Sequence, residues 1–234
     1  MKKNNIKLNA DNLFFDPKIF YLKVLNSSKL IPIGKVYCVG RNYAEHALEM
    51  KEGVETKEPF FFTKPPQSLT QKNIIKFPSN TSDLHHEVEL VIVIGSECAN
   101  ISSKDASDYI FGSAVGIDLT KRDIQKIAKD QRKPWDLSKG FNDSAPISLI
   151  NTKVFDYKNL KLNLSVNNEI KQSGSTSSMM WTVGELISYL SKQITLFPGD
   201  IIFTGTPSGV GSLKKGDNIS ASIEGIGIID IKLI

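Results

Sequence analysis

The stretch Leu84-His85-His86-Glu87-Val88-Glu89-Leu90-Val91-Ile92-Val93-Ile94-Gly95 decides the fold and contains the first candidate site. Its run of aliphatic and β-branched residues ends at a glycine, which predicts a buried strand. Side chains alternate between the faces of a strand, so Glu87 and Glu89 are expected on one side. An uncompensated buried charge is costly, so two buried carboxylates need a cation, of which a hard divalent metal is the simplest. Two solvated glutamates at the start of the strand are the alternative.

The composition is that of an ordinary globular protein: 234 residues, 40% hydrophobic and 23% charged, with a net charge of +4. The lysines are scattered, and the lack of a basic stripe with interleaved aromatics argues against nucleic-acid binding. The mild basicity suits an anionic substrate. Cys38 and Cys98 match neither a metal-binding spacing nor a disulfide framework, which predicts a cytoplasmic protein. No secretory signal or membrane-spanning stretch is evident, so no membrane association is expected.

A second candidate site lies in the segment that follows Gly40. Asn42 and Glu45 have the spacing of a capping box and predict a helix. On that helix His46 and Glu49 share a face, and a carboxylate beside an imidazole fixes its tautomer and raises its basicity. The pair is therefore a candidate general base, with an exposed surface ion pair as the alternative. Helix and the polar residues 51–58 together form a candidate lid.

Candidate ligand contacts occur at the ends of two further expected strands. Lys64 ends an aromatic strand, where it either faces an anionic ligand or is solvated. Asp118 ends a strand of small residues, where it is either a third metal ligand or a helix-entry residue. Thr120 and Asp123 predict an N-cap for the helix that follows. On that helix Arg122 and Gln125 share a face.

Two loops complete the candidate site. Lys139 lies between two aromatic anchors in the loop 134–141. The glycine-rich loop 205–211 is not a phosphate-binding P-loop, but it could present Thr206 and backbone N–H groups to an oxyanion.

Local signals elsewhere fit one β-rich α+β domain. Asn167-Asn168 predicts a hairpin turn, and Thr182 with Glu185 predicts a capping box. A short helix around Ser103–Ala106 is expected within residues 99–109. Residues 1–34 are expected to be an irregular N-terminal segment.

Five segments in order resemble the fumarylacetoacetate hydrolase family, in particular its small acylpyruvases and oxaloacetate decarboxylases: Cys38–His46, His85–Leu90, Asp118–Gln125, Leu137–Phe141 and Gly199–Pro207. The resemblance covers residues 35–234. It implies an α+β fold, a β-rich mixed β-sandwich roll with short flanking helices, and a homodimer.

The resemblance also implies roles for individual residues. Glu87, Glu89 and Asp118 would hold Mg²⁺ or Mn²⁺. His46 and Glu49 would activate water. Lys139 would be a catalytic residue. The positions expected to bind the substrate are Arg41, Lys64, Arg122, Gln125 and Thr206. Fumarylacetoacetase itself has a further metal-binding aspartate seven residues before its histidine. Val39 stands there in this chain, which favours the acylpyruvase branch.

These implications predict a metal-dependent hydrolase that cleaves a C–C bond in acylpyruvate-type 1,3-dicarbonyl acids, with a pyruvate enolate stabilised by the metal. The His46–Glu49 pair favours hydrolysis, because hydrolysis needs a base that activates water and the other reactions of this site need such a base less. The same site could serve an oxaloacetate decarboxylase, an oxaloacetate keto–enol tautomerase or a 2-hydroxyhepta-2,4-diene-1,7-dioate isomerase. Two further alternatives are a metal-stabilised binding module without activity and an Fe or Zn site that includes His85, as in cupin-like oxygenases.

Overall fold

The fold is built around a five-stranded mixed sheet with strand β8 (Val88–Ile94) near its centre. The computed structural model describes residue 14, residues 18–49 and residues 58–234. The strand order is β4-β3-β14-β8-β9, with bounds Phe61–Lys64, Val36–Val39, Ile201–Phe203, Val88–Ile94 and Ile110–Ile117. Every residue of β8 is buried, as expected for an apolar strand that is covered on both faces.

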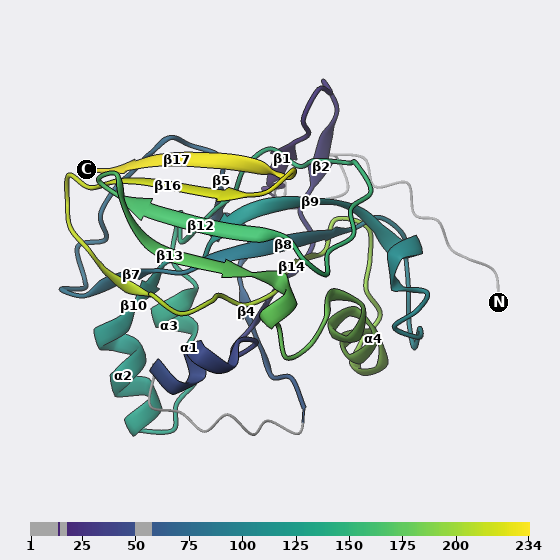
Figure 1. Cartoon of the computed structure of the whole chain (residues 1–234), viewed down its shortest axis with the longest axis horizontal. Helices are drawn as coiled ribbons and strands as arrows, with labels where there is room; N and C mark the ends of the chain where they lie inside the picture. Colours follow the sequence, from purple (N-terminus) through teal and green to yellow (C-terminus); the bar gives the residue numbers. More distant parts are fainter. Residues whose placement is uncertain (1–13, 15–17, 50–57) are drawn as a thin grey trace.

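A second five-stranded sheet packs on one face of the first (Figure 1). Its order is β13-β12-β16-β17-β6, with bounds Glu169–Ser175, Lys161–Val166, Asn218–Ile223, Gly227–Leu233 and Ile74–Ile75. Leu90 and Ile92 belong to the core cluster that also contains Leu162 and Leu164 of β12. The predicted strand-rich α+β architecture of layered sheets with short helices is confirmed.

The opposite face of β8 belongs to a smaller core cluster. Val91 and Val93 pack there with Leu22 and Val24. The side chains of Glu87 and Glu89 alternate in phase with these valines, so the site lies at the end of this second face. The neighbouring strands are β1 (Tyr21–Lys23), β2 (Leu30–Pro32), β5 (Leu69–Thr70) and β11 (Ala145–Pro146). β1 and β2 form a hairpin, and Leu22 of β1 is buried, so the expectation of irregular chain is wrong for this part of residues 1–34.

The predicted buried strand that ends at Gly95 is present as β8, but the strand does not continue through Glu87, where it breaks. Strand β7 (Leu84–His86) belongs to a separate three-stranded sheet with β10 (Thr120–Lys121) and β15 (Gly211–Leu213). At the break, the Asp118 N–H donates to the Glu87 carbonyl at 2.8 Å. Glu87 therefore lies where the chain passes from the small sheet to the large one.

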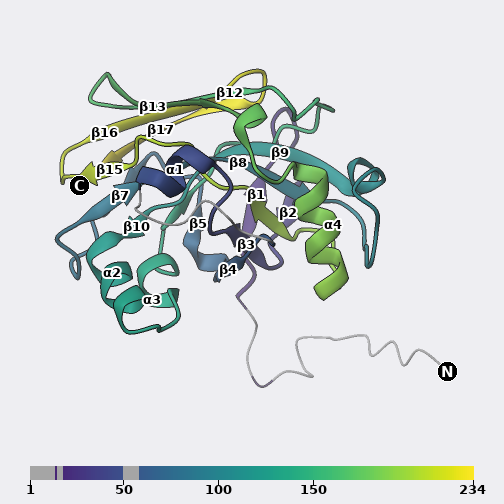
Figure 2. The ribbon, with the colours of Figure 1, turned by 60° about the horizontal axis from the view of Figure 1, so that its bottom comes forward.

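The helices lie at the margins of the sheets (Figure 2). They are α1 (Ala44–Glu49), α2 (Arg122–Asp130), α3 (Asp136–Lys139) and α4 (Val183–Gln193), with 3₁₀ turns at Pro66–Ser68, Ala106–Tyr109 and Thr176–Ser178. Helices α1, α2 and α3 gather near β7 and β10, whereas α4 lies apart from them. Within the described residues, no helix is both long and apolar enough to cross a membrane.

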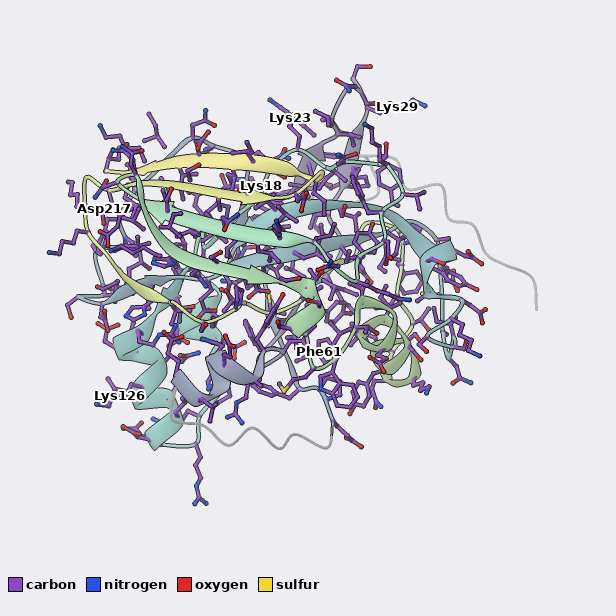
Figure 3. All side chains as sticks on the ribbon, in the orientation of Figure 1. Lys18, Lys23, Lys29, Phe61, Lys126 and Asp217 are labelled. Carbon is purple, nitrogen blue, oxygen red and sulfur yellow. The ribbon has the colours of Figure 1, made fainter. Side chains whose placement is uncertain are left out.

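Several local predictions are confirmed. Thr182 and Glu185 form the predicted capping box of α4. Asn167 and Asn168 form the predicted turn between β12 and β13, both with positive φ angles of 51° and 68°. Charged side chains such as those of Lys23, Lys29 and Lys126 lie on the outside of the molecule (Figure 3).

Other local predictions are wrong. The Asp123 carboxylate accepts from Thr81 Oγ1 at 2.6 Å and from the Ser82 N–H at 2.9 Å, and Lys121, not Thr120, is the N-cap of α2. Within the range 99–109, where a short helix is expected, the structure has only a 3₁₀ turn at Ala106–Tyr109.

The predicted lid loop stays a prediction, because residues 50–57, which contain most of it, lie outside the described residues.

Candidate metal centre and acid–base site

Three buried carboxylates meet where β8 and β9 are paired. Glu87 precedes β8, Glu89 lies within it, and Asp118 directly follows β9, which runs antiparallel to β8. One oxygen atom from each carboxylate lies within 4.8 Å of the other two. Their residues are at most 5% exposed. The structure thus brings together the three residues that the sequence singled out as metal ligands.

Two lysines neutralise part of this charge. Lys139, at the end of α3, places its Nζ 2.8 Å from Glu87 Oε2, 2.6 Å from Asp118 Oδ2 and 2.6 Å from Thr120 Oγ1. Lys64, at the end of β4, places its Nζ 2.8 Å from Asp118 Oδ1. It also donates to the Lys139 carbonyl and, at 3.0 Å, to Ser144 Oγ. The Lys64 side chain is 0% exposed, so these contacts favour a positioning role for it, and substrate contact stays a prediction.

Arg122 and Gln125 lie on the first turns of α2 beside Glu87. Arg122 Nη2 contacts Glu87 Oε1 at 2.5 Å, and Arg122 Nη1 donates to Gln125 Oε1 at 2.6 Å. The sequence placed Arg122 and Gln125 on one face of a helix, and the structure adds that this face meets a carboxylate of the cluster.

The surroundings shift the pKa values of the two glutamates in opposite directions. Burial alone would raise the pKa of the Glu87 carboxyl, but Lys139 and Arg122 outweigh it and hold that pKa well below its usual value. Burial, aided by the negative charges of Asp118 and Glu87, raises the pKa of Glu89 well above its usual value. The Glu89 carboxylate therefore needs a further cation to remain ionised inside the protein.

These residues fit a hard divalent cation. All three potential ligand atoms are carboxylate oxygens, the donor type that Mg²⁺ and Mn²⁺ prefer. Among the residues that the structure describes, His85 does not belong to the carboxylate cluster. Its Nε2 lies 3.0 Å from Asp83 Oδ1, which disfavours the alternative of an Fe or Zn site that includes this histidine.

The His46–Glu49 pair lies on α1. His46 Nδ1 is 3.2 Å from Glu49 Oε2, and His46 is 7% exposed. Glu49 also accepts from the Gly209 N–H at 3.2 Å, which connects α1 to the glycine-rich loop. The alternative of an exposed surface histidine is thus excluded. Asn42 does not cap α1; its Nδ2 donates to the carbonyls of Trp181 and Thr204 at 2.9 and 2.8 Å.

The glycine-rich loop contacts the carboxylate cluster through its backbone. Gly205 N–H donates to Glu89 Oε2 at 2.6 Å. The backbone of Gly205 has a φ of +96°, and a Cβ atom there would lie 2.7 Å from the Asn42 Cβ, so glycine is required. Thr206 Oγ1 donates to the Val88 carbonyl at 2.8 Å. The hydroxyl proton of Thr206 is therefore used within the protein, which disfavours the predicted donation from this hydroxyl to an oxyanion.

Aromatic side chains lie next to the cluster. The Lys139 Nζ is 5.0 Å from the centre of the Phe62 ring, and both Phe62 and Phe60 contact Trp135. Arg41 lies over Phe60, with 5.6 Å from its guanidinium carbon to the ring centre. Arg41 is thus placed beside this aromatic group, and its role in carboxylate binding stays a prediction.

Gln172, which the sequence did not indicate, is the main addition from the structure. It lies in β13 of the second sheet, is 1% exposed, and accepts from the Val88 N–H between the two glutamates at 3.0 Å. No local motif marks it, because its partners are more than thirty positions away.

Comparison with known proteins identifies relatives of this chain that are named for reactions of oxaloacetate. The chain is 44% identical over 194 residues to the mitochondrial oxaloacetate tautomerase of Bos taurus, which covers 82% of this chain and 87% of that protein. It is 46% identical over 196 residues to the mitochondrial oxaloacetate decarboxylase of Dictyostelium discoideum, with coverage of 82% and 89%.

A solved structure shares the fold over nearly its whole length. The fumarylpyruvate hydrolase of Pseudomonas aeruginosa, crystallised with Mn²⁺ and pyruvate, superposes with a TM-score of 0.92 and 36% identity, covering 95% of this chain and 99% of that one. Residues 35–233 match the family described as fumarylacetoacetate (FAA) hydrolase C-terminal. The family resemblance in the sequence is confirmed: the chain belongs to the fumarylacetoacetate hydrolase family.

Proposed function

We propose that this chain is a divalent-metal-dependent enzyme that interconverts the keto and enol forms of oxaloacetate or a closely related 2-oxo acid. The observation that carries the proposal is the cluster of Glu87, Glu89 and Asp118 on one face of the large sheet, with the Lys139 ammonium beside it. Relatives that are 44% and 46% identical and are named for oxaloacetate chemistry support this choice of substrate.

The three carboxylates would hold Mg²⁺ or Mn²⁺, which would supply Lewis-acid stabilisation of negative charge on a substrate oxygen. His46 would transfer the proton. Its Nδ1 faces Glu49, so Nε2 is the nitrogen that can exchange a proton with the substrate. The three N–H donors of Lys139 bind Glu87, Asp118 and Thr120, so Lys139 would stabilise developing negative charge through its own charge and not through a direct hydrogen bond. Arg122 with Gln125 would orient the substrate.

The charges around the cluster support a substrate with two carboxylates. The three acidic side chains are matched by three cations: Lys64, Lys139 and Arg122. A bound divalent ion would leave an excess of positive charge in a buried site, and a dicarboxylate such as oxaloacetate would balance it.

Hydrolysis of an acylpyruvate is the second candidate. The orientation of His46 by Glu49 and the likeness to a fumarylpyruvate hydrolase favour it. In that reaction His46 would take a proton from water, and the water oxygen would attack the distal carbonyl carbon. The charge of Lys139 would stabilise the resulting oxyanion. The C–C bond would then break to give the free acid and a pyruvate enolate, which would take up the proton held by His46.

A side-by-side assay tests both candidates. Purified protein would be supplied with oxaloacetate, acetylpyruvate and fumarylpyruvate, each with Mg²⁺, Mn²⁺ or chelator. Tautomerisation, decarboxylation and hydrolysis would be followed separately. We expect metal-dependent tautomerisation to be fastest; faster acylpyruvate cleavage would favour the second candidate. Glu87→Gln should abolish the activity, and Asp143→Asn, which alters a carboxylate paired with the exposed Lys72, should preserve it. Equal rates with metal and with chelator would refute the metal-dependent proposal.

A further inference from the structure

The segment that carries Glu87 and Glu89 lacks continuous strand pairing, because β7 ends at His86 and β8 begins at Val88. Backbone groups at such a break need other partners when they are buried. The side chain of Gln172 supplies them from the opposite sheet. Its Oε1 accepts from the Val88 N–H and from His86 Nδ1, both at 3.0 Å.

The other end of the Gln172 amide holds the glycine-rich loop. Its Nε2 donates to Thr206 Oγ1 at 2.8 Å and to the Pro207 carbonyl at 2.9 Å. Thr206 Oγ1 in turn donates to the Val88 carbonyl at 2.8 Å. The amide therefore makes four hydrogen bonds, two as acceptor and two as donor, and every polar direction of the side chain has a partner.

These contacts hold both peptide groups of Val88, the residue between the two glutamates. Gln172 binds the Val88 N–H, Thr206 binds the Val88 carbonyl, and the neighbouring Gly205 N–H binds Glu89 Oε2 at 2.6 Å. Because Val88 separates the two carboxylates in sequence, the orientation of its backbone sets their relative position. Neither Gln172 nor His86 is a potential metal ligand in the cluster found among the described residues, which consists of Glu87, Glu89 and Asp118.

We propose that Gln172 is a positioning residue that fixes the distance and direction between Glu87 and Glu89, and thereby sets the affinity of the site for a divalent metal. This inference rests on the proposed function. Residues that orient metal ligands by hydrogen bonding typically change metal affinity about 10–100-fold when they are replaced. Thr206 acts in the same assembly through its hydroxyl group.

The test uses Mn²⁺ as the probe, with its Kd measured by electron paramagnetic resonance or calorimetry on the full chain. Gln172→Met keeps the length of the side chain and removes all four hydrogen bonds, so we expect the Kd to rise about 10–100-fold. Gln71→Met is the matched control, because Gln71 makes three hydrogen bonds, to Lys23 and Ser148, in another part of the fold. It should keep the wild-type Kd although it loses a comparable set of bonds.

Circular dichroism and thermal unfolding would show whether each variant is folded. If Gln172→Met fails to fold, Thr206→Val and Thr206→Ser replace it: only the valine, which has no hydroxyl group, should weaken Mn²⁺ binding. An unchanged Kd in folded Gln172→Met or Thr206→Val would overturn the inference, as would an equal loss in Gln71→Met. Failure of the wild-type protein to bind Mn²⁺ would instead refute the proposed function, so the two failures are distinguishable.

Discussion

Replacing Lys64 by methionine should lower the stability of the fold and should have little effect on substrate binding. The Lys64 and Asp118 side chains are 0% and 1% exposed, and their charged atoms are 2.8 Å apart. Breaking a buried ion pair by removing one partner typically costs about 3–5 kcal/mol, because the other charge stays buried. Asp118 keeps Lys139 as a partner at 2.6 Å, so we expect the lower end, about 3 kcal/mol.

The assay is thermal and urea unfolding of metal-free protein, with KM for oxaloacetate measured in parallel. For a chain of this length, about 3 kcal/mol corresponds to a Tm that is roughly 6–12 °C lower. Lys72→Met is the matched control, since Lys72 pairs with Asp143 at 3.2 Å but its side chain is 67% exposed. Such an exposed pair contributes at most about 1 kcal/mol.

Two results would refute this reasoning. A Lys64→Met protein as stable as Lys72→Met would show that the buried pair is not a main support of the fold. A raised KM for oxaloacetate with unchanged unfolding would show instead that Lys64 contacts the substrate, as the family resemblance implied.

Four further predictions concern the site and the assembly. Glu87→Gln and Asp118→Asn should each abolish Mn²⁺ binding by calorimetry, since each removes one of three anionic ligands; wild-type affinity would contradict the ligand assignment. Because the pKa of Glu89 is raised, mainly by burial, this group keeps a proton in the metal-free protein where an ordinary glutamate is ionised. Mn²⁺ binding should then release a proton and strengthen as pH rises; calorimetry in buffers of different ionisation enthalpy would detect this, and no proton release would contradict it. The stability of the metal-free protein should change in the opposite direction. The contribution of Glu89 to its free energy of unfolding is present at low pH and is lost as pH rises through the raised pKa. His46→Ala should remove acylpyruvate hydrolysis and spare much of any oxaloacetate decarboxylation, and equal losses would show that His46 is not specifically a water base. The chain should sediment as a homodimer, and a monomer at all concentrations would contradict that expectation.

Local sequence signals predicted the parts of the fold that depend on neighbouring residues. The capping box of Thr182 and Glu185 and the Asn167-Asn168 turn are each complete within four residues, so the pattern contains all the partners. The side of the strand shared by Glu87 and Glu89 follows from the twofold alternation of strands.

Signals failed where distant segments supply the partner. The capping pattern at Asn42 was misleading, because its amide binds Trp181 and Thr204, 139 and 162 positions away. The break at Glu87 was invisible for the same reason, since the partner of the Val88 N–H is Gln172, 84 positions away. The burial of Lys64 likewise depends on Asp118 and Ser144, which a strand-end lysine does not reveal.

The bond from Gly205 to Glu89 joins residues 116 positions apart, and that separation has a consequence for folding. Contacts between distant segments form only after much of the chain entropy has been lost, so they arise late in folding. The backbone donor that holds the Glu89 carboxylate is therefore in place only once these distant segments have met, so a metal that binds the complete site favours the native state. Such selective binding stabilises the native state by about 2.7 kcal/mol when free metal is at about 100 times its Kd. The availability of the metal in the surroundings would thus set how long the chain resists unfolding and proteolysis.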